Sequence, residues 1–161
     1  MEELKIAATA NKQVLYTCLT EQIELLVGNE KNIIANMANV AAAIKQTFGF
    51  LWVGFYMCDT ENELVLAPFQ GPIACTRIKL GQGVCGTAWK LQQTVIVPDV
   101  EKFEGHIACN SASKSEIVVP IFHNGKIIAV LDIDSDELNS FDETDKDYLQ
   151  KIVEIMMQSK V

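Results

Sequence analysis

Apolar residues recur at intervals of three and four positions along two stretches near the start of the chain, and this periodicity predicts two helices. The first helix is expected over about residues 12–27 and the second over about residues 32–47. Gly49 follows the second stretch, where a glycine commonly ends a helix. A terminal helix is also predicted, because Ser140 and Glu143 have the spacing of a capping box.

Shorter apolar runs in the middle of the chain predict β-strands. In the first strand, Val53 and Phe55 share one face and Trp52 and Tyr56 share the other, because successive side chains alternate. Helices at both ends of a middle rich in hairpins predict an α+β fold with a mostly antiparallel sheet, in one domain over residues 1–161. The expected strands cover about residues 51–58, 63–69, 95–97, 116–122 and 126–134, with a short helix over 84–92 and irregular loops over 70–83 and 99–114.

Asn124-Gly125 separates two apolar strands and is a typical hairpin turn. A two-residue loop would pair His123 with Lys126 and would set apolar residues against acidic ones along the hairpin. A three-residue loop, with a left-handed Gly125 beside a bulge, would pair His123 with Ile127. This second register sets apolar residues against each other on one face, so the alternation of side chains favours it.

The favoured register also gathers three carboxyl groups on the other face of the hairpin. Glu116 then faces Asp134, and Asp132 lies beside them. Repulsion between like charges and partial burial both raise carboxyl pKa values, so one acid could donate a proton near neutral pH. Trp52 and Tyr56, on the non-core face of the first strand, could wall a pocket here. The alternatives are solvated acids at a strand end and a second core layer of aromatic rings.

Three of the five cysteines lie in predicted loops or at the start of a helix. Cys109 follows a loop that a substrate can reach, and Cys75 lies in the loop before the short helix. Cys85 lies at the start of that helix, where backbone N–H groups favour a thiolate. Cys18 is expected in a core, and Cys58 is assigned no role. The three loop and helix-start thiols indicate cysteine redox chemistry.

Two other uses of these thiols are less well supported by the sequence. A metal site of Cys75, Cys85, Cys109 and His106 would normally show closely spaced ligand pairs, which are absent, so we expect no bound metal. His106 and Cys109 also have the residue types of a cysteine hydrolase dyad. Their separation of three residues within a loop is weak support for that reaction.

The formal net charge of −8 argues against a nucleic-acid surface, which requires clustered Lys and Arg. No apolar run approaches the roughly 20 residues that span a membrane. The acidic start, Met1-Glu2-Glu3, is unlike a secretion signal, and an odd number of cysteines without such a signal is typical of reduced thiols. We therefore expect a soluble cytoplasmic protein that binds neither nucleic acid nor membranes.

Six short motifs follow one another from residue 52 onward. They are Trp52-Val53-Gly54-Phe55-Tyr56, Phe69-Gln70-Gly71-Pro72 with Cys75, Gly83-Val84-Cys85-Gly86, Gly105-His106-Ile107-Ala108-Cys109, Ser115-Glu116-Ile117-Val118-Val119-Pro120 and Leu131-Asp132-Ile133-Asp134-Ser135. In this order they resemble the free methionine-R-sulfoxide reductases, which are stand-alone GAF domains. The resemblance is specific, because other GAF domains do not carry this set of cysteines.

The resemblance implies a GAF fold, with a central antiparallel sheet, the terminal helices on one side and a ligand pocket on the other. It implies reduction of free methionine-R-sulfoxide without a cofactor, recycling by thioredoxin and a possible homodimer. The main alternative is a non-catalytic GAF module that senses a small ligand or the redox state. The resemblance also implies roles for the cysteines: Cys109 is the nucleophile, and Cys75 is the favoured resolving thiol, with Cys85 also able to take part. It implies that three acids bind and polarise the substrate, namely Glu116, Asp132 and Asp134. Trp52 and Tyr56 are implied to line the substrate pocket.

Overall fold

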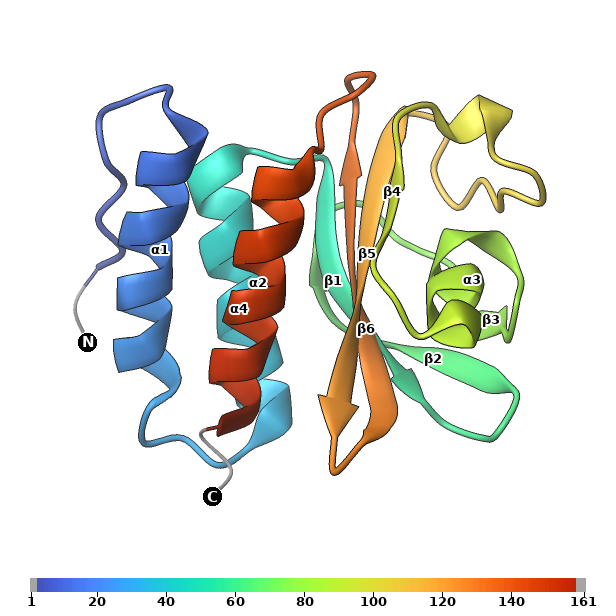
Figure 1. Cartoon of the computed structure of the whole chain (residues 1–161), viewed down its shortest axis with the longest axis horizontal. Coiled ribbons are helices and arrows are strands. Elements are labelled where there is room, and N and C mark those ends of the chain that lie inside the picture. The colour runs from blue at the N-terminus through green and yellow to red at the C-terminus, as the bar shows by residue number, and fades with distance from the viewer. Residues whose placement is uncertain (1–2, 159–161) are drawn as a thin grey trace.

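Three long helices cover one face of an antiparallel sheet in the computed structural model, which describes residues 3–158 (Figure 1). They are α1 (Lys12–Val27), α2 (Ile33–Phe48) and α4 (Glu143–Gln158), and none of the helices in the described range is both long and apolar enough to cross a bilayer. The short helix α3 (Gly83–Leu91) and the 3-10 turn η1 (Val100–Lys102) lie on the opposite face. Within residues 3–158 the strands follow the order β3-β2-β1-β6-β5-β4, with bounds β1 (Trp52–Cys58), β2 (Glu63–Gln70), β3 (Arg77–Lys79), β4 (Val95–Val97), β5 (Ser115–His123) and β6 (Lys126–Ser135).

This architecture confirms the predicted α+β fold with an antiparallel sheet. Both N-terminal helices were predicted to within about one residue. Gly49 ends α2 in the left-handed conformation, with φ of 69°, and donates its N–H to the carbonyl of Lys45. The predicted domain over residues 1–161 extends past the described residues at both ends.

Two local predictions were wrong. The predicted loop over residues 70–83 contains β3, in which only Ile78 is buried, so the apolar pattern was too short to reveal a strand. The start of α4 is capped by Asp142 and not by Ser140. The Asp142 carboxylate accepts hydrogen bonds from the N–H groups of Thr144 and Asp145, and the Asp145 carboxylate accepts one from the N–H of Asp142.

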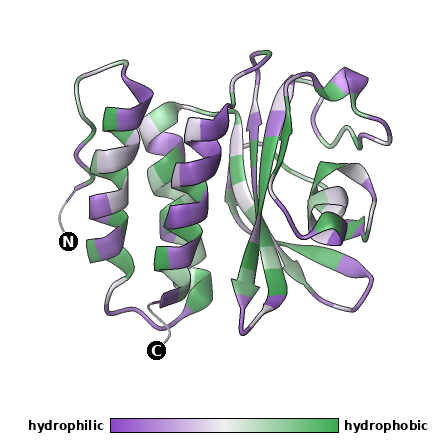
Figure 2. Ribbon diagram, in the orientation of Figure 1, coloured by the Kyte–Doolittle hydropathy of each residue, from purple (hydrophilic) through white to green (hydrophobic). Residues whose placement is uncertain are grey.

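The alternating side chains of β1, β5 and β6 supply two apolar layers. Val53 and Phe55 pack under the three long helices, as predicted, whereas Trp52 and Tyr56 belong to the opposite layer, beneath α3. Figure 2 shows hydrophobic residues along much of β5 and β6, while the helices alternate between hydrophobic and hydrophilic residues. The sheet therefore has one face committed to a helical core and a second face that mixes apolar and acidic side chains.

The pairing of β5 with β6 follows the predicted register in its buried part. Ile117 faces Ile133, Glu116 faces Asp134, and Asp132 lies opposite Val118. The predicted pairing of His123 with Ile127 was wrong, because His123 faces Lys126 across a two-residue turn.

Both turn residues have positive φ, 50° at Asn124 and 76° at Gly125, as a type I′ turn requires. The prediction placed one unpaired residue of the hairpin in the turn. In the structure the unpaired residue lies in the strands instead, at a bulge between Ile121 and Phe122. The bulge shifts the pairing by one residue, and this shift places the three acids on the same face of the sheet.

Candidate active site

The predicted site residues meet on the sheet face opposite the three long helices. One cavity of 50 Å³ is lined by seven of the eight of them, and the eighth, Cys75, is bonded to one of the seven. Because strands β1, β6 and β5 are adjacent, side chains distant in sequence converge here. The seven lining residues are Trp52 and Tyr56 from β1, Cys85 from α3, Cys109 from the segment before β5, Glu116 from β5, and Asp132 and Asp134 from β6.

Cys75 and Cys109 are joined in a disulfide, so the structure represents the oxidised chain. Their Cα atoms are 5.4 Å apart although 34 residues separate them in sequence. Cys18, Cys58 and Cys85 are free thiols. Since Cys75 and Cys109 are bonded to each other, the four-residue metal site considered from the sequence is not assembled in this state.

The three carboxyl groups are brought together as the register predicted. Glu116 and Asp132 are each only 6% exposed, and Asp134 is partly buried. Among residues 3–158 no lysine or arginine forms an ion pair with any of the three. The carboxyl groups therefore lie close together without a cationic side chain to balance them, and they are not solvated acids at a strand end.

Burial and mutual repulsion change the protonation of these acids. Burial, followed by the charges of Asp132 and Asp134, raises the pKa of Glu116 well above its usual range. Burial and the charge of Asp134 likewise raise the pKa of Asp132 well above its usual range. Burial raises the pKa of Asp134 to about 6, although a hydrogen bond of 2.6 Å from the Ser113 hydroxyl opposes this change. The cluster consequently retains protons at a pH where ordinary carboxyl groups are ionised.

The aromatic residues form one side of the cavity and are held rigidly. Trp52 stacks on Phe69 with ring centroids 5.2 Å apart, and its Nε1 donates a hydrogen bond of 3.1 Å to the carbonyl of Pro72. The Tyr56 hydroxyl donates to the carbonyl of Cys75 at 2.9 Å. Both rings are therefore part of a core layer and also line the cavity, so the two readings of the sequence are compatible.

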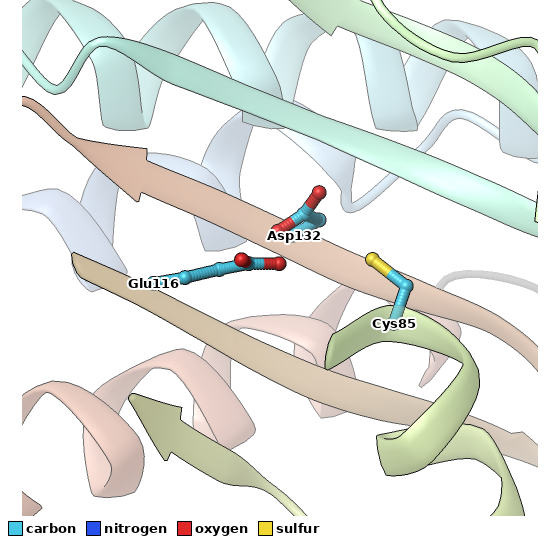
Figure 3. A group of neighbouring side chains, drawn as sticks. All are labelled: Cys85, Glu116 and Asp132. Atoms are coloured by element: carbon cyan, nitrogen blue, oxygen red, sulfur yellow. The ribbon is translucent and has the colours of Figure 1, made fainter. Parts of the chain in front are cut away.

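Cys85 lies in the first turn of α3 and points at the carboxyl groups of Glu116 and Asp132 (Figure 3). The expectation that the helix start favours a thiolate was wrong. Burial, followed by the charges of Asp132 and Glu116, raises the pKa of the Cys85 thiol well above its usual value. Residue 86, next in the helix, is glycine, and a Cβ there would lie 2.4 Å from the carbonyl oxygen of Lys79, so α3 packs tightly against the end of β3.

Two further residues complete the site. His106 lines the cavity with its Nε2 atom 3.9 Å from Glu116 Oε2, and burial lowers the pKa of this imidazole. The sequence had linked His106 only with Cys109 or a metal. Ser113, which hydrogen-bonds Asp134, was not predicted at all, since no local pattern connects a loop serine with a strand 21 residues later.

Comparison with known proteins gives a consistent assignment. The GAF domain family matches residues 31–158. GAF domain-containing protein A of Dictyostelium discoideum is 63% identical and covers 96% of this chain and 98% of its own. The free methionine-R-sulfoxide reductase of Saccharomyces cerevisiae is 40% identical over 99% of this chain and 93% of its own.

A solved structure agrees with these relatives. The free methionine-R-sulfoxide reductase from Neisseria meningitidis, in complex with its substrate, has a TM-score of 0.96 and 52% identity, covering 99% of this chain and 96% of that one. The predicted GAF fold is thereby confirmed. This chain belongs to the free methionine-R-sulfoxide reductase family of GAF domains.

Proposed function

We propose that this chain reduces free methionine-R-sulfoxide to methionine, with Cys109 as nucleophile and thioredoxin as the external reductant. The observation that carries the proposal is that Cys109, bonded to Cys75, lines the same cavity as three closely packed acids. The Neisseria meningitidis enzyme, solved with its substrate, supports the choice of reaction. A single cytoplasmic domain carries out the whole reaction without a cofactor, because the thiols themselves supply the electrons.

The first step transfers oxygen from the substrate sulfoxide to the sulfur of Cys109. The Cys109 thiolate attacks the sulfoxide sulfur, and the sulfoxide oxygen takes a proton from one of the acids, Glu116, Asp132 or Asp134. Oxygen passes to Cys109, which becomes a sulfenic acid, and methionine leaves. Cys109 loses two electrons in this step and the substrate sulfur gains them. Carboxyl groups with raised pKa values suit this role, because they keep their protons at a higher pH than ordinary carboxyl groups do.

The second step closes the disulfide. The Cys75 thiol condenses with the Cys109 sulfenic acid, and water leaves. The disulfide in the structure has the connectivity of this product. A dithiol of thioredoxin then reduces the bond and returns both cysteines to thiols. Cys85 is a second resolving thiol, and its burial beside the acids makes it the less reactive of the two.

The cavity walls select a single free amino acid. An ionised carboxylate of the cluster pairs with the substrate ammonium, and the rings of Trp52 and Tyr56 contact the S-methyl group. Because both charged ends of the substrate are enclosed, a methionine sulfoxide within a peptide would clash.

We also propose a homodimer, on the basis of the family resemblance alone.

The proposed function predicts strict dependence on the substrate epimer. With thioredoxin, its reductase and NADPH, consumption of NADPH should follow free methionine-R-sulfoxide and stay near background with the S epimer or with a peptide-bound sulfoxide. Absence of turnover with both epimers would contradict the proposal. It would favour the alternative of a GAF module that senses a ligand or the redox state.

The two bonded cysteines should separate in a single-turnover experiment. Reduced Cys109→Ser should release no methionine, whereas Cys75→Ser should release about one equivalent and then recycle slowly. Cys58→Ser is the matched control and should behave as the parent chain, because Cys58 lies outside the cavity lining. Release of methionine by Cys109→Ser would reassign the nucleophile, and unimpaired recycling in Cys75→Ser would make Cys85 the resolving thiol.

The acids should control the alkaline limb of the kcat/KM profile against pH. The rate falls where the proton donor ionises, and the negative charge of Asp134 raises the pKa of both Glu116 and Asp132. Asp134→Asn removes that charge, so the limb should move to lower pH. Glu116→Gln should slow the chemical step, by about 10²–10⁴-fold if Glu116 is the donor. Asp136 is exposed, so the control variant Asp136→Asn should change neither the position of the alkaline limb nor the rate of the chemical step. If the limb of Asp134→Asn stays in place or moves to higher pH, the electrostatic coupling between Asp134 and the other two acids is excluded.

A further inference from the structure

Three buried side chains of types that can bind a metal ion converge in the lining of the cavity. One ligand atom each from Cys85, Glu116 and Asp132 lies within 4.8 Å of the other two. Figure 3 shows the sulfur and the two carboxyl groups turned toward one another from α3, β5 and β6. The three residues are 3–6% exposed, so the group is held by the core and not by mobile surface side chains.

Asp132 hydrogen-bonds with Glu116 and Cys85 inside the group, but one of its oxygens has no partner, and no lysine or arginine of residues 3–158 balances the acids. Asp132 Oδ1 is the one buried side-chain oxygen or nitrogen within residues 3–158 that has no hydrogen-bond partner. His106, 3.9 Å from Glu116, is the nearest basic side chain, and burial disfavours its charged form. An unpaired buried oxygen and uncompensated acids are costly. A bound cation would satisfy the oxygen and balance the acids.

The donor types indicate which cation fits. One sulfur and two carboxylate oxygens suit a borderline ion such as Zn²⁺ better than Mg²⁺ or Ca²⁺, which prefer oxygen ligands alone. Donors on one tetrahedral zinc ion lie about 3.4–3.6 Å apart, so an inward shift of roughly 1 Å by these side chains suffices. The fourth position would open into the cavity.

We propose that Cys85, Glu116 and Asp132 form a reversible binding site for a single Zn²⁺ ion, and for Cd²⁺ as its analogue. Binding releases the protons of the thiol and the carboxyl groups, because metal ligands must be deprotonated. A bound ion therefore removes the acids that the proposed reaction needs. Zinc is an inhibitor in this account, and the inhibition, unlike the binding itself, rests on the proposed function.

The test uses the full oxidised chain, in which Cys85 is the only free thiol among the described residues that line the cavity. Titration with Cd²⁺ at pH 7.5 should produce the ultraviolet thiolate-to-cadmium absorption band, saturating at one equivalent, and Zn²⁺ should displace Cd²⁺ and erase it. Cys85→Ser should lose the band. Asp132→Asn, which keeps the thiol, should weaken Cd²⁺ binding about tenfold or more. Circular dichroism checks that each variant is folded.

The matched control is the double variant Cys18→Ser with Cys58→Ser, which removes the two free thiols outside the cavity and should retain the band. The proposed site would be overturned if the parent chain showed no band or if the band persisted in Cys85→Ser. It would also be overturned if Asp132→Asn bound Cd²⁺ as tightly as the parent chain, or if the control lost the band. In a separate assay of the reduced enzyme, Zn²⁺ should lower the rate of sulfoxide reduction, because the proton donors are occupied, and EDTA should reverse the effect. If Cd²⁺ binds as expected but the chain reduces no sulfoxide, the proposed function fails and the metal site stands.

Discussion

The antiparallel pairing of β5 with β6 is the constraint on which the site depends. One register places Ile117 and Ile133 under the long helices and, on the other face, sets Glu116 opposite Asp134 with Asp132 beside them. A slip of one residue would turn the apolar side chains out of the core and the acids into it. The helical core therefore holds the acids together, although their mutual repulsion opposes that arrangement.

Protonation relieves the cost of this arrangement. Ionised carboxylates in a buried cluster without a lysine or arginine would be strongly destabilising, and the acids respond by retaining protons. The proton source that we propose for sulfoxide reduction is thus a consequence of burial without a cationic partner. The same absence of a partner underlies the proposed affinity for Zn²⁺, since a divalent ion and protons are two ways to neutralise one cluster.

Much of this arrangement was predictable from local patterns. The helix periodicity up to Gly49, the alternation in β1 and the parity argument for the hairpin each located side chains correctly on one face or the other. Prediction failed where long-range contacts decide: β3 exists through pairing with β2, and Ser113 reaches Asp134 across the fold. It also failed at Cys85, because the position in α3 was visible in the sequence but its burial among the acids was not.

The retention of protons by the buried acids is tested most directly by a pH titration. The carboxyl carbons are followed by ¹³C NMR on protein labelled at Asp and Glu, with single variants for assignment. We expect that at pH 7 Glu116 or Asp132 still carries a proton, while Asp134 titrates near pH 6. A spectrum in which Glu116, Asp132 and Asp134 are all fully ionised at pH 7 would contradict it.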